Sequence, residues 1–169
     1  MKDLDAVAVS VGPGSYTGLR VGLAAAKGFC YALNIPLITV NSLKIIAAAA
    51  KDETIDFICP LIDARRMEVF TALYDKDLQE KNAPHALIVD ENSFASLLVS
   101  GKILFCGNGI RKLQPFISNS NAFFSHKMAD ASHLASLSFP CYCKNEFADL
   151  AYAEPLYIKE FYSAPGKTR

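Results

Sequence analysis

Over the first fifty residues, short apolar runs alternate with longer segments in which apolar positions recur at helical spacing. Residues 6–11 form an apolar run that ends at Gly-Pro-Gly, which predicts a buried strand and a turn. Residues 18–33 have helical spacing, and Asn-Ile-Pro ends this pattern, as helices usually end before proline. Residues 37–40 predict a second strand, and the alanine-rich residues 43–51 a second helix. This alternation predicts parallel strands covered by helices.

The pattern changes after a polar joint at residues 52–56. Two strand-like runs, residues 55–62 and 67–74, flank Asp63-Ala-Arg-Arg66 and predict an antiparallel hairpin. After the hairpin we expect a polar turn or loop at 75–84, a strand at 86–89 and a helix that starts at Asn92 or Ser93 and ends at Gly101. A strand at 103–106 follows and is closed by Gly107-Asn-Gly109. The last expected elements are a helix between 129 and 137, irregular structure at 140–149 and an extended arm at 152–162. We therefore predict an α/β protein with two lobes, residues 1–52 and residues 53–169.

The composition narrows the class of protein. Lys and Arg together number 17, as do Asp and Glu, so no overall charge draws the chain to nucleic acid. The five cysteines follow no disulfide framework, and Cys30, Cys59 and Cys106 lie in apolar stretches, which is typical of buried thiols in a reducing compartment. The first five residues are polar, and the longest apolar run is far short of a membrane span. We expect a cytoplasmic protein that does not enter a membrane.

Glycine recurs at positions 12, 14, 18, 22 and 28 in the segment VGPGSYTGLRVGLAAAKGF, residues 11–29. Glycines at the start of a helix can hold a phosphate through backbone N–H groups. The spacing here does not match the Walker loop, in which Lys and Ser or Thr follow the last glycine. It also misses the dinucleotide fingerprint, because Gly18 comes one residue late. A phosphate loop is therefore the weaker of two interpretations of this segment.

The stronger interpretation is close packing. Gly18, Gly22 and Ala26 recur every four residues, so they form a stripe with little side chain on one face of the predicted helix. A glycine inside a helix costs roughly 0.5–1 kcal/mol relative to alanine, and the close approach of another backbone can compensate for this cost. The stripe can pack inside its own lobe or against a partner, and the sequence favours neither. Arg20 is available to solvent or to that partner.

Few residues are candidates for catalysis or metal binding. Asp63 is a candidate carboxylate, but an aspartate in a hairpin turn more often bonds its own backbone. Arg65 and Arg66 suit an acidic partner or an RNA phosphate, or are simply solvated. The histidines, at positions 85, 126 and 133, have no Cys, Asp or Glu that completes a metal site. Ser15 directly follows its glycine, which excludes the Gly-x-Ser-x-Gly pattern of serine hydrolases. We expect no metal and no cofactor.

Three motifs resemble the bacterial TsaB (YeaZ) family and occur in its order. The glycine-rich segment from Val11 to Phe29 is similar to the family's signature. Asp63-Ala-Arg-Arg-Met-Glu-Val-Phe70 is similar to its Asp-Ala-Arg-Arg hairpin, and Glu154-Pro-Leu-Tyr-Ile-Lys159 to its C-terminal Pro-x-Tyr ending. The resemblance covers nearly the whole chain. It implies an actin-like, sugar-kinase-like fold of two ribonuclease-H-type lobes.

The resemblance also implies a function. TsaB proteins are non-catalytic members of the machinery that makes threonylcarbamoyladenosine on tRNA. They pair with the catalytic paralogue TsaD and, through that pair, with the ATPase TsaE. The paralogue holds a metal on a His-x-x-x-His helix, a spacing that the histidines of this chain do not have. We therefore expect a partner interface at Gly18, Arg20, Gly22 and Ala26, which also suits a homodimer, and only indirect contact with tRNA.

The chain departs from this family at its start. Family members carry further residues before the strand that begins here at Leu4, and those residues supply the first strands of the amino-terminal lobe. We therefore expect this lobe to be incomplete, with a bare sheet edge and uncovered apolar surface.

The alternative function is an actin-like small-molecule kinase or ATPase. In that protein, Gly12, Gly14 and Ser15 form one phosphate loop, the turn from Gly107 to Gly109 forms a second, and both surround Asp63. In a scaffold protein the same residues are vestigial. A third alternative, a module that binds tRNA directly, is disfavoured by the balanced charge.

Overall fold

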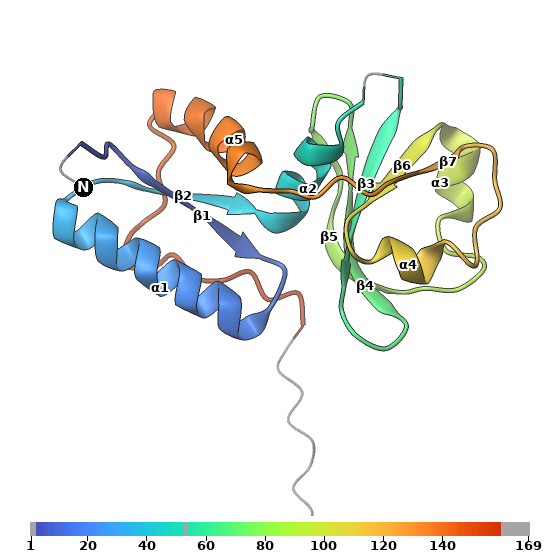
Figure 1. Cartoon of the computed structure of the whole chain (residues 1–169), viewed down its shortest axis with the longest axis horizontal. Helices are drawn as coiled ribbons and strands as arrows, with labels where there is room; N and C mark the ends of the chain where they lie inside the picture. The colour runs from blue at the N-terminus through green and yellow to red at the C-terminus, as the bar shows by residue number, and fades with distance from the viewer. Residues whose placement is uncertain (1–2, 53, 160–169) are drawn as a thin grey trace, which may run out of the picture.

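The computed structural model describes residues 3–52 and 54–159, which form two lobes (Figure 1). In the first lobe, β1 (Val7–Gly12) pairs in parallel with β2 (Leu37–Asn41), and α1 (Tyr16–Leu33) is the crossover between them, as predicted. Asn34 ends α1 in the left-handed conformation, where its N–H donates to the Cys30 carbonyl. The glycine-rich segment therefore contributes the last residues of a strand, a turn and most of a helix.

Helices cover both faces of the two-stranded sheet. Leu23, Ala26 and Cys30 of α1 are buried with Leu37 against one face. The other face carries Ile38 and Val40, and it is covered by α5 (Ala131–Cys143), which lies on the opposite side of the sheet from α1 in Figure 1. The first lobe is thus a three-layer sandwich.

The second lobe contains a five-stranded sheet. Its strands are β3 (Phe57–Asp63), β4 (Glu68–Asp75), β5 (Glu80–Ile88), β6 (Ile103–Cys106) and β7 (Ala122–Ser125). They lie in the order β5-β4-β3-β6-β7, with antiparallel pairs on the β5 side of β3 and parallel pairs on the β7 side. This mixed sheet with helices on its faces confirms the expected ribonuclease-H-type lobe.

Three helices complete the second core. α2 (Ser42–Ala50), capped by the Asn41 side chain, lies between the two lobes and packs Leu43 and Ala47 against one face of the five-stranded sheet. On the other face lie α3 (Ala95–Ser100) and α4 (Ile110–Leu113), which enclose Phe105. α2 therefore joins the two lobes through a shared apolar layer.

Two predicted boundaries were wrong. Residues 75–84 were expected to be a turn or loop, but β5 begins at Glu80 and includes Pro84. β5 is an edge strand whose residues 80–83 are exposed, so it lacks the alternating apolar signal of a half-buried strand and tolerates proline. Likewise, α5 continues through Pro140 to Cys143, where irregular structure was expected. The short elements α4 and β7 were not predicted at all.

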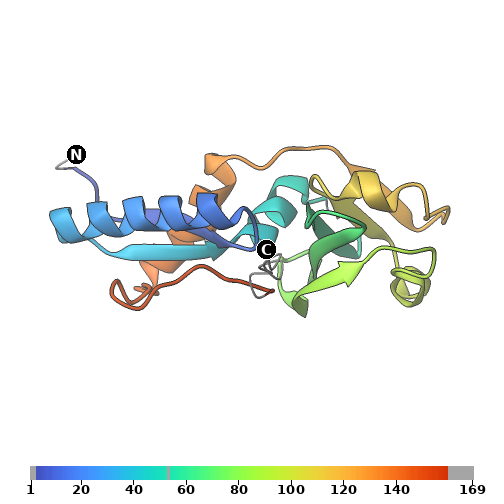
Figure 2. The same cartoon turned by 90° about the horizontal axis from the view of Figure 1, so that it is seen from below.

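The end of the chain returns to the first lobe. We call residues 145–159 the C-terminal arm; Figure 2 shows it running back along the lobe that contains β1 and β2. The Ala148 N–H donates to the Leu37 carbonyl over 2.8 Å, and the Leu156 N–H donates to the Val11 carbonyl over 2.7 Å. Both α5 and the arm, which the predicted division assigns to the second lobe, thus pack against the first.

Within the described part of the chain, the outer edge of β1 is bare, as expected from the sequence. β1 pairs with β2 on one side, and no strand within residues 3–52 and 54–159 pairs with its other side. A groove of about 700 Å³ lies beside this edge, and Phe139 in its lining is 68% exposed. Cys30, Cys59 and Cys106 are buried free thiols, as predicted. Among the described helices, none is both long enough and apolar enough to cross a membrane.

Candidate functional site

The Gly-Pro-Gly turn at the end of β1 is packed against the C-terminal arm. Gly12 has φ +117°, and a Cβ at this position would lie 2.8 Å from the Leu156 carbonyl oxygen. Glycine is therefore needed here for the close approach of the arm. Ser15 caps α1, with its Oγ accepting from the Gly18 N–H over 3.3 Å. These contacts account for Gly12 and Ser15 without a phosphate.

The second glycine turn is packed against β3. Gly107 has φ +91°, and a Cβ there would lie 2.5 Å from the Leu61 carbonyl oxygen. The same oxygen accepts from the Gly109 N–H over 2.9 Å, and a Cβ on Gly109 would meet the Leu61 Cβ at 2.9 Å. Both glycines allow the strand and the turn to touch, so one of the N–H groups available to a phosphate is already used inside the protein.

Asp63 also has partners within the chain. Its carboxylate pairs with the Lys112 ammonium at 2.5 Å and accepts from the Arg65 N–H at 2.7 Å, while its own N–H donates to the Asn108 side chain. The hydrogen bond from Lys112 lowers the pKa of Asp63, so the carboxyl group is ionised and ion-paired at neutral pH. Lys112, on α4, was not identified from the sequence, because no motif connects it with Asp63.

The predicted phosphate-loop residues line two different cavities. Asp63 and Gly107 line a groove of about 450 Å³ together with Arg111 and His126. Gly14 lines a separate cavity of about 550 Å³, which we call the arm cavity. Its described lining is Pro13, Gly14, Tyr16, Arg20, Arg65, Phe70, Leu156, Tyr157, Ile158 and Lys159. The arrangement required by a kinase, two glycine loops around one carboxylate, is therefore divided between two sites.

The predicted interface residues of α1 separate as well. Ala26 is 5% exposed and lies in the core of the first lobe. A Cβ added to Gly22 would have Val9 Cγ2, on β1, as its nearest neighbour at 4.0 Å. Only Gly18 and Arg20 are exposed. The stripe expected to meet a partner thus lies largely against the protein's own β1, which is the other packing arrangement that the spacing permits.

A different face of α1 is open. Its exposed residues include Thr17, Val21, Ala25 and Gly28, which follow one another around successive turns of the helix. Val21 is 63% exposed, and no atom lies within 4 Å of the position that a Cβ on Gly28 would take. This open face, defined by these four residues, is small-residue and uncharged. Its position follows from the rotation of α1 about its axis relative to the sheet, which the sequence alone did not determine.

Arg20 is held against the arm. Its Nε donates to the Tyr157 hydroxyl over 2.8 Å, and its guanidinium lies 4.1 Å from the centre of the Tyr16 ring. Tyr16 and Tyr157 stack with their ring centres 5.1 Å apart. The hydrogen bond to Tyr157 raises the pKa of Arg20. Because Tyr157 is 137 residues from Arg20, no local pattern indicates that it meets Tyr16 and Arg20.

The histidines lie apart. His133 belongs to the capping box of α5 with Asp130, His126 lines the groove beside Asp63, and His85 lies on β5. Within the described part of the chain, no three side chains of His, Cys, Asp or Glu gather as they would around a metal ion.

The chain is similar to proteins connected with one tRNA modification. Residues 1–90 match the family model of TsaD, tRNA N6-adenosine threonylcarbamoyltransferase. The tRNA threonylcarbamoyladenosine biosynthesis protein TsaB of Bacillus subtilis is 44% identical over 73 residues, which are 43% of this chain and 31% of that protein. TsaB of Escherichia coli is 36% identical over 78 residues, which are 46% of this chain and 34% of that protein. This chain thus covers about a third of these curated relatives.

The fold has a solved counterpart. The structure of YeaZ from Pseudomonas aeruginosa matches with a TM-score of 0.78 and 24% sequence identity, over 92% of this chain and 74% of that one. The similarity extends over both lobes and establishes the actin-like fold.

Proposed function

The chain belongs to the family that the TsaD model describes, as a TsaB (YeaZ) homologue, and from this premise we propose that it is an accessory subunit in threonylcarbamoyladenosine modification of tRNA. It has no catalytic centre of its own. It acts in the cytoplasm by pairing with a catalytic TsaD-type paralogue, and this pair recruits a TsaE-type ATPase. Its contact with tRNA is made through the complex.

The open face of α1 carries this proposal. A helix with Thr17, Val21, Ala25 and Gly28 on its surface lets a second helix approach closely, because no long side chain has to be displaced or desolvated. The same face is self-complementary about a twofold axis, so without the paralogue the chain forms a homodimer through it. Gly18, at the edge of this face, and Arg20 complete the contact, whereas Gly22 and Ala26 support the helix from below.

The two glycine turns support an accessory role. Gly12 and Gly107 are explained by backbone contacts with Leu156 and Leu61, and Asp63 is ion-paired with Lys112. A general base must be free to accept a proton, and a carboxylate held by a lysine is poorly suited to this role. The contacts of Gly12, Gly107 and Asp63 therefore fit a structural role for these residues better than a catalytic one.

The proposal is tested by placing a charge on the open face. We expect Ala25→Arg to weaken association with the TsaD-type partner at least about tenfold, since a buried unpaired charge opposes binding. Ala135→Arg, on an exposed alanine of α5, is the matched control and should leave affinity unchanged. Sedimentation of the mixed proteins measures both. Unchanged affinity in Ala25→Arg would contradict the proposed interface.

The accessory role has a separate test. The chain alone, incubated with ATP and magnesium, should release no phosphate above the uncatalysed rate, whereas the kinase or ATPase alternative requires turnover. Sustained phosphate release that is lost in Asp63→Asn would overturn the accessory role in favour of that enzyme.

A further inference from the structure

We propose that the outer edge of β1 binds an extended, basic segment of another polypeptide, which adds a strand to the two-stranded sheet and places large apolar side chains in the groove between β1 and α5. We call this groove of about 700 Å³ the edge groove; its lining includes Leu4, Ala6, Ala8, Ile38, Ala135 and Phe139. The inference goes beyond the proposed function, because it concerns a sheet edge and not the open face of α1.

The backbone of β1 has hydrogen-bonding groups to offer on its outer side. The Val7 N–H donates to the Pro36 carbonyl over 3.0 Å, on the side of β1 where β2 lies. Because successive peptide groups of a strand point to opposite sides, those of Ala8 and Ser10 point away from β2. No strand in residues 3–52 and 54–159 pairs with that side. An extended segment can bond to these groups, as peptides do when they add a strand to a sheet edge.

The side chains of β1 that face α5 are small. Ala6 and Ala8 pack on this face beside Ile38, and Ser10, the next residue in the alternation, bonds to the Ser42 hydroxyl. A further groove of about 290 Å³ lies at Ser10 and Leu134, farther along the strand. The edge of the sheet beneath α5 therefore has unfilled apolar space along the length of β1.

Large apolar side chains around the edge groove remain in contact with water. Leu4 is 47% exposed, Phe139 is 68% exposed and Tyr142 is 36% exposed. They lie together at one groove and not scattered singly, which is typical of a surface that binds another protein. Covering them removes apolar area from water and so favours binding.

The small side chains of β1 argue against a second copy as the occupant. Two copies that pair β1 with β1 in antiparallel orientation about a twofold axis bring the same face of each strand to one side of the joined sheet. The second copy would then contribute Ala6, Ala8 and Ser10, which leave the edge groove unfilled. A strand with large apolar side chains at alternate positions fills it, because every second residue faces α5.

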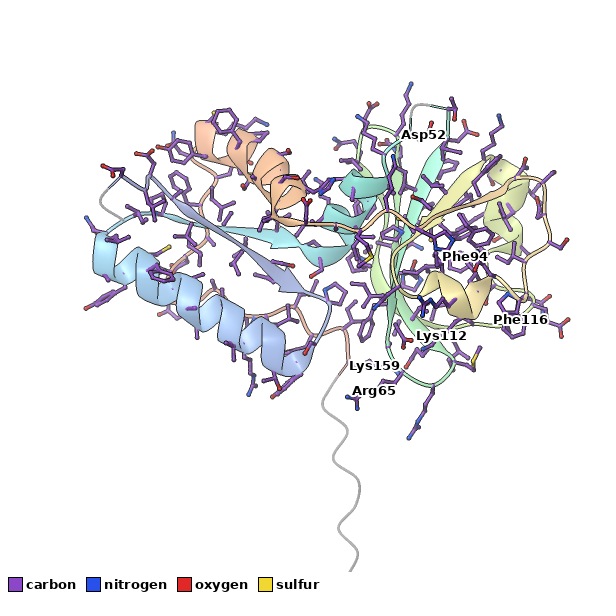
Figure 3. The ribbon with its side chains drawn as sticks, in the orientation of Figure 1. Asp52, Arg65, Phe94, Lys112, Phe116 and Lys159 are labelled. Carbon is purple, nitrogen blue, oxygen red and sulfur yellow. The ribbon has the colours of Figure 1, made fainter. Side chains whose placement is uncertain are left out.

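The charge of the edge groove favours a basic segment. Asp3 and Asp5, just before β1, belong to its lining, and none of its described lining residues is Lys, Arg or His. Figure 3 shows the labelled cations Arg65, Lys112 and Lys159 away from α5, toward the second lobe. A cationic side chain at the end of the bound strand can pair with the two aspartates. Because both carboxylates are exposed, this pairing contributes more to selectivity than to affinity.

The test measures binding of a fluorescent synthetic peptide to the full chain by anisotropy. The probe, Arg-Thr-Ile-Thr-Leu-Thr-Ile-Thr-Arg, alternates threonine with apolar residues, and an arginine at each end allows either strand direction to bring a cation to Asp3 and Asp5. We expect saturable binding, at least about tenfold tighter than that of a peptide with the same composition but adjoining apolar residues, since only alternation turns all of them toward α5. Glutamate in place of both arginines should weaken binding about threefold.

Two variants already used for the α1 interface give a reciprocal control. Ala135 lines the edge groove, whereas Ala25 lies on the open face of α1. Ala135→Arg obstructs the groove and repels the arginines of the probe, so it should weaken probe binding at least about tenfold, while Ala25→Arg should change it less than about twofold. Both alanines are exposed in helices, where arginine is well tolerated, so both variants should keep the Tm of the parent.

Hydrogen exchange locates the bound strand. The probe should slow exchange of the Ala8 amide at least about tenfold, because its N–H then donates to the peptide. The inference would be overturned by no saturable binding at millimolar peptide, by equal affinity for the alternating and grouped peptides, by equal affinity for the arginine and glutamate peptides, by equal losses in the two variants, or by unchanged exchange at Ala8.

A second copy would give a different result. Self-association of the chain that is lost in Ala135→Arg and retained in Ala25→Arg would assign the edge of β1 to a homodimer and overturn the inference. None of these outcomes bears on the pairing with a TsaD-type protein, for which the expected effects of Ala25→Arg and Ala135→Arg are reversed.

Discussion

At the scale of single residues, the glycines of this chain differ in whether the surrounding structure leaves room for a side chain, a difference that the sequence does not show. Gly107 lies where a Cβ would meet the Leu61 carbonyl oxygen at 2.5 Å, and its φ is +91°. We expect Gly107→Ala to lower the free energy of unfolding by about 1–3 kcal/mol through overpacking and backbone strain. Urea unfolding followed by circular dichroism measures the change.

Gly28→Ala is the matched control. Gly28 lies inside α1 with no atom within 4 Å of the added Cβ, so alanine should raise the free energy of unfolding by about 0.5–1 kcal/mol. If both substitutions changed stability in the same direction, close contact between the turn and β3 would not be the reason for Gly107.

Asp130 gives a prediction for pH. Its carboxylate accepts from the Ser132 hydroxyl and from His133, and these hydrogen bonds lower the pKa of Asp130 to about 2. The unfolded chain has an aspartate pKa of about 3.9. The capping interaction is therefore fully present above about pH 4 and is lost as the pH falls toward 2.

The substitution Asp130→Asn isolates this titration, because asparagine also caps helices but does not ionise. We expect the Tm of the parent to fall more steeply than that of Asp130→Asn between pH 4 and pH 2. Parallel decreases in Tm would show that the carboxylate of Asp130 does not contribute to the pH dependence.

At the scale of secondary-structure elements, the C-terminal arm is held by Lys27. The Lys27 ammonium, on α1, donates to the carbonyls of Ala151 and Ala153 over 3.0 and 2.8 Å. Lys27→Met retains the apolar part of the side chain and removes these donors, so it should destabilise the protein by about 1–2 kcal/mol. Hydrogen exchange should accelerate at the Leu156 N–H, and Lys76→Met, at an exposed turn lysine, should leave both measurements unchanged. Unaltered exchange in Lys27→Met would contradict this role.

The elements that could be predicted are those with a buried stripe. β1, α1, β2 and the β3–β4 hairpin carry apolar positions at periods that match their structure. β5 and β7 are edge strands, and α4 is a single short turn of helix, so their sequences lack a sustained period. These three elements are held by their neighbours in the sheet and core, a long-range effect that a local pattern does not contain.

In the candidate site, too, the local motifs could be predicted from the sequence and their long-range contacts could not. The Gly-Pro-Gly turn and the Asp-Ala-Arg-Arg hairpin are visible as motifs, but their partners Leu156, Lys112 and Tyr157 come from distant segments. The stripe of Gly18, Gly22 and Ala26 indicated close packing, and the rotation of α1 decides what it packs against. That rotation depends on the apolar surface of the whole lobe, so the position of the open face required the structure.

At the scale of the whole molecule, the two sheets differ in how they are closed. In the five-stranded sheet β3 has a hydrogen-bonded neighbour on each side, whereas β1 pairs on one side only among the described strands. The Val7 N–H donates toward β2, so the alternation of a strand turns the Ala8 N–H outward.

We therefore expect the Ala8 amide to exchange hydrogen far faster than the Ile58 amide of β3, which should exchange only through global unfolding. Hydrogen exchange read by nuclear magnetic resonance makes the comparison. Equal protection of the two amides would show that the edge of β1 is covered in solution.

The position of α5 and the arm has a consequence for synthesis of the protein. A ribosome releases β1, α1 and β2 before the strands of the other sheet, whereas α5, which covers the face opposite α1, and the arm are released after those strands. The nascent second lobe can assemble as soon as β7 emerges, while the apolar face of the first lobe opposite α1 stays uncovered until α5 emerges. Chaperone binding during translation should accordingly concentrate on the face of the β1–β2 sheet that carries Ile38 and Val40, because α5 covers it last.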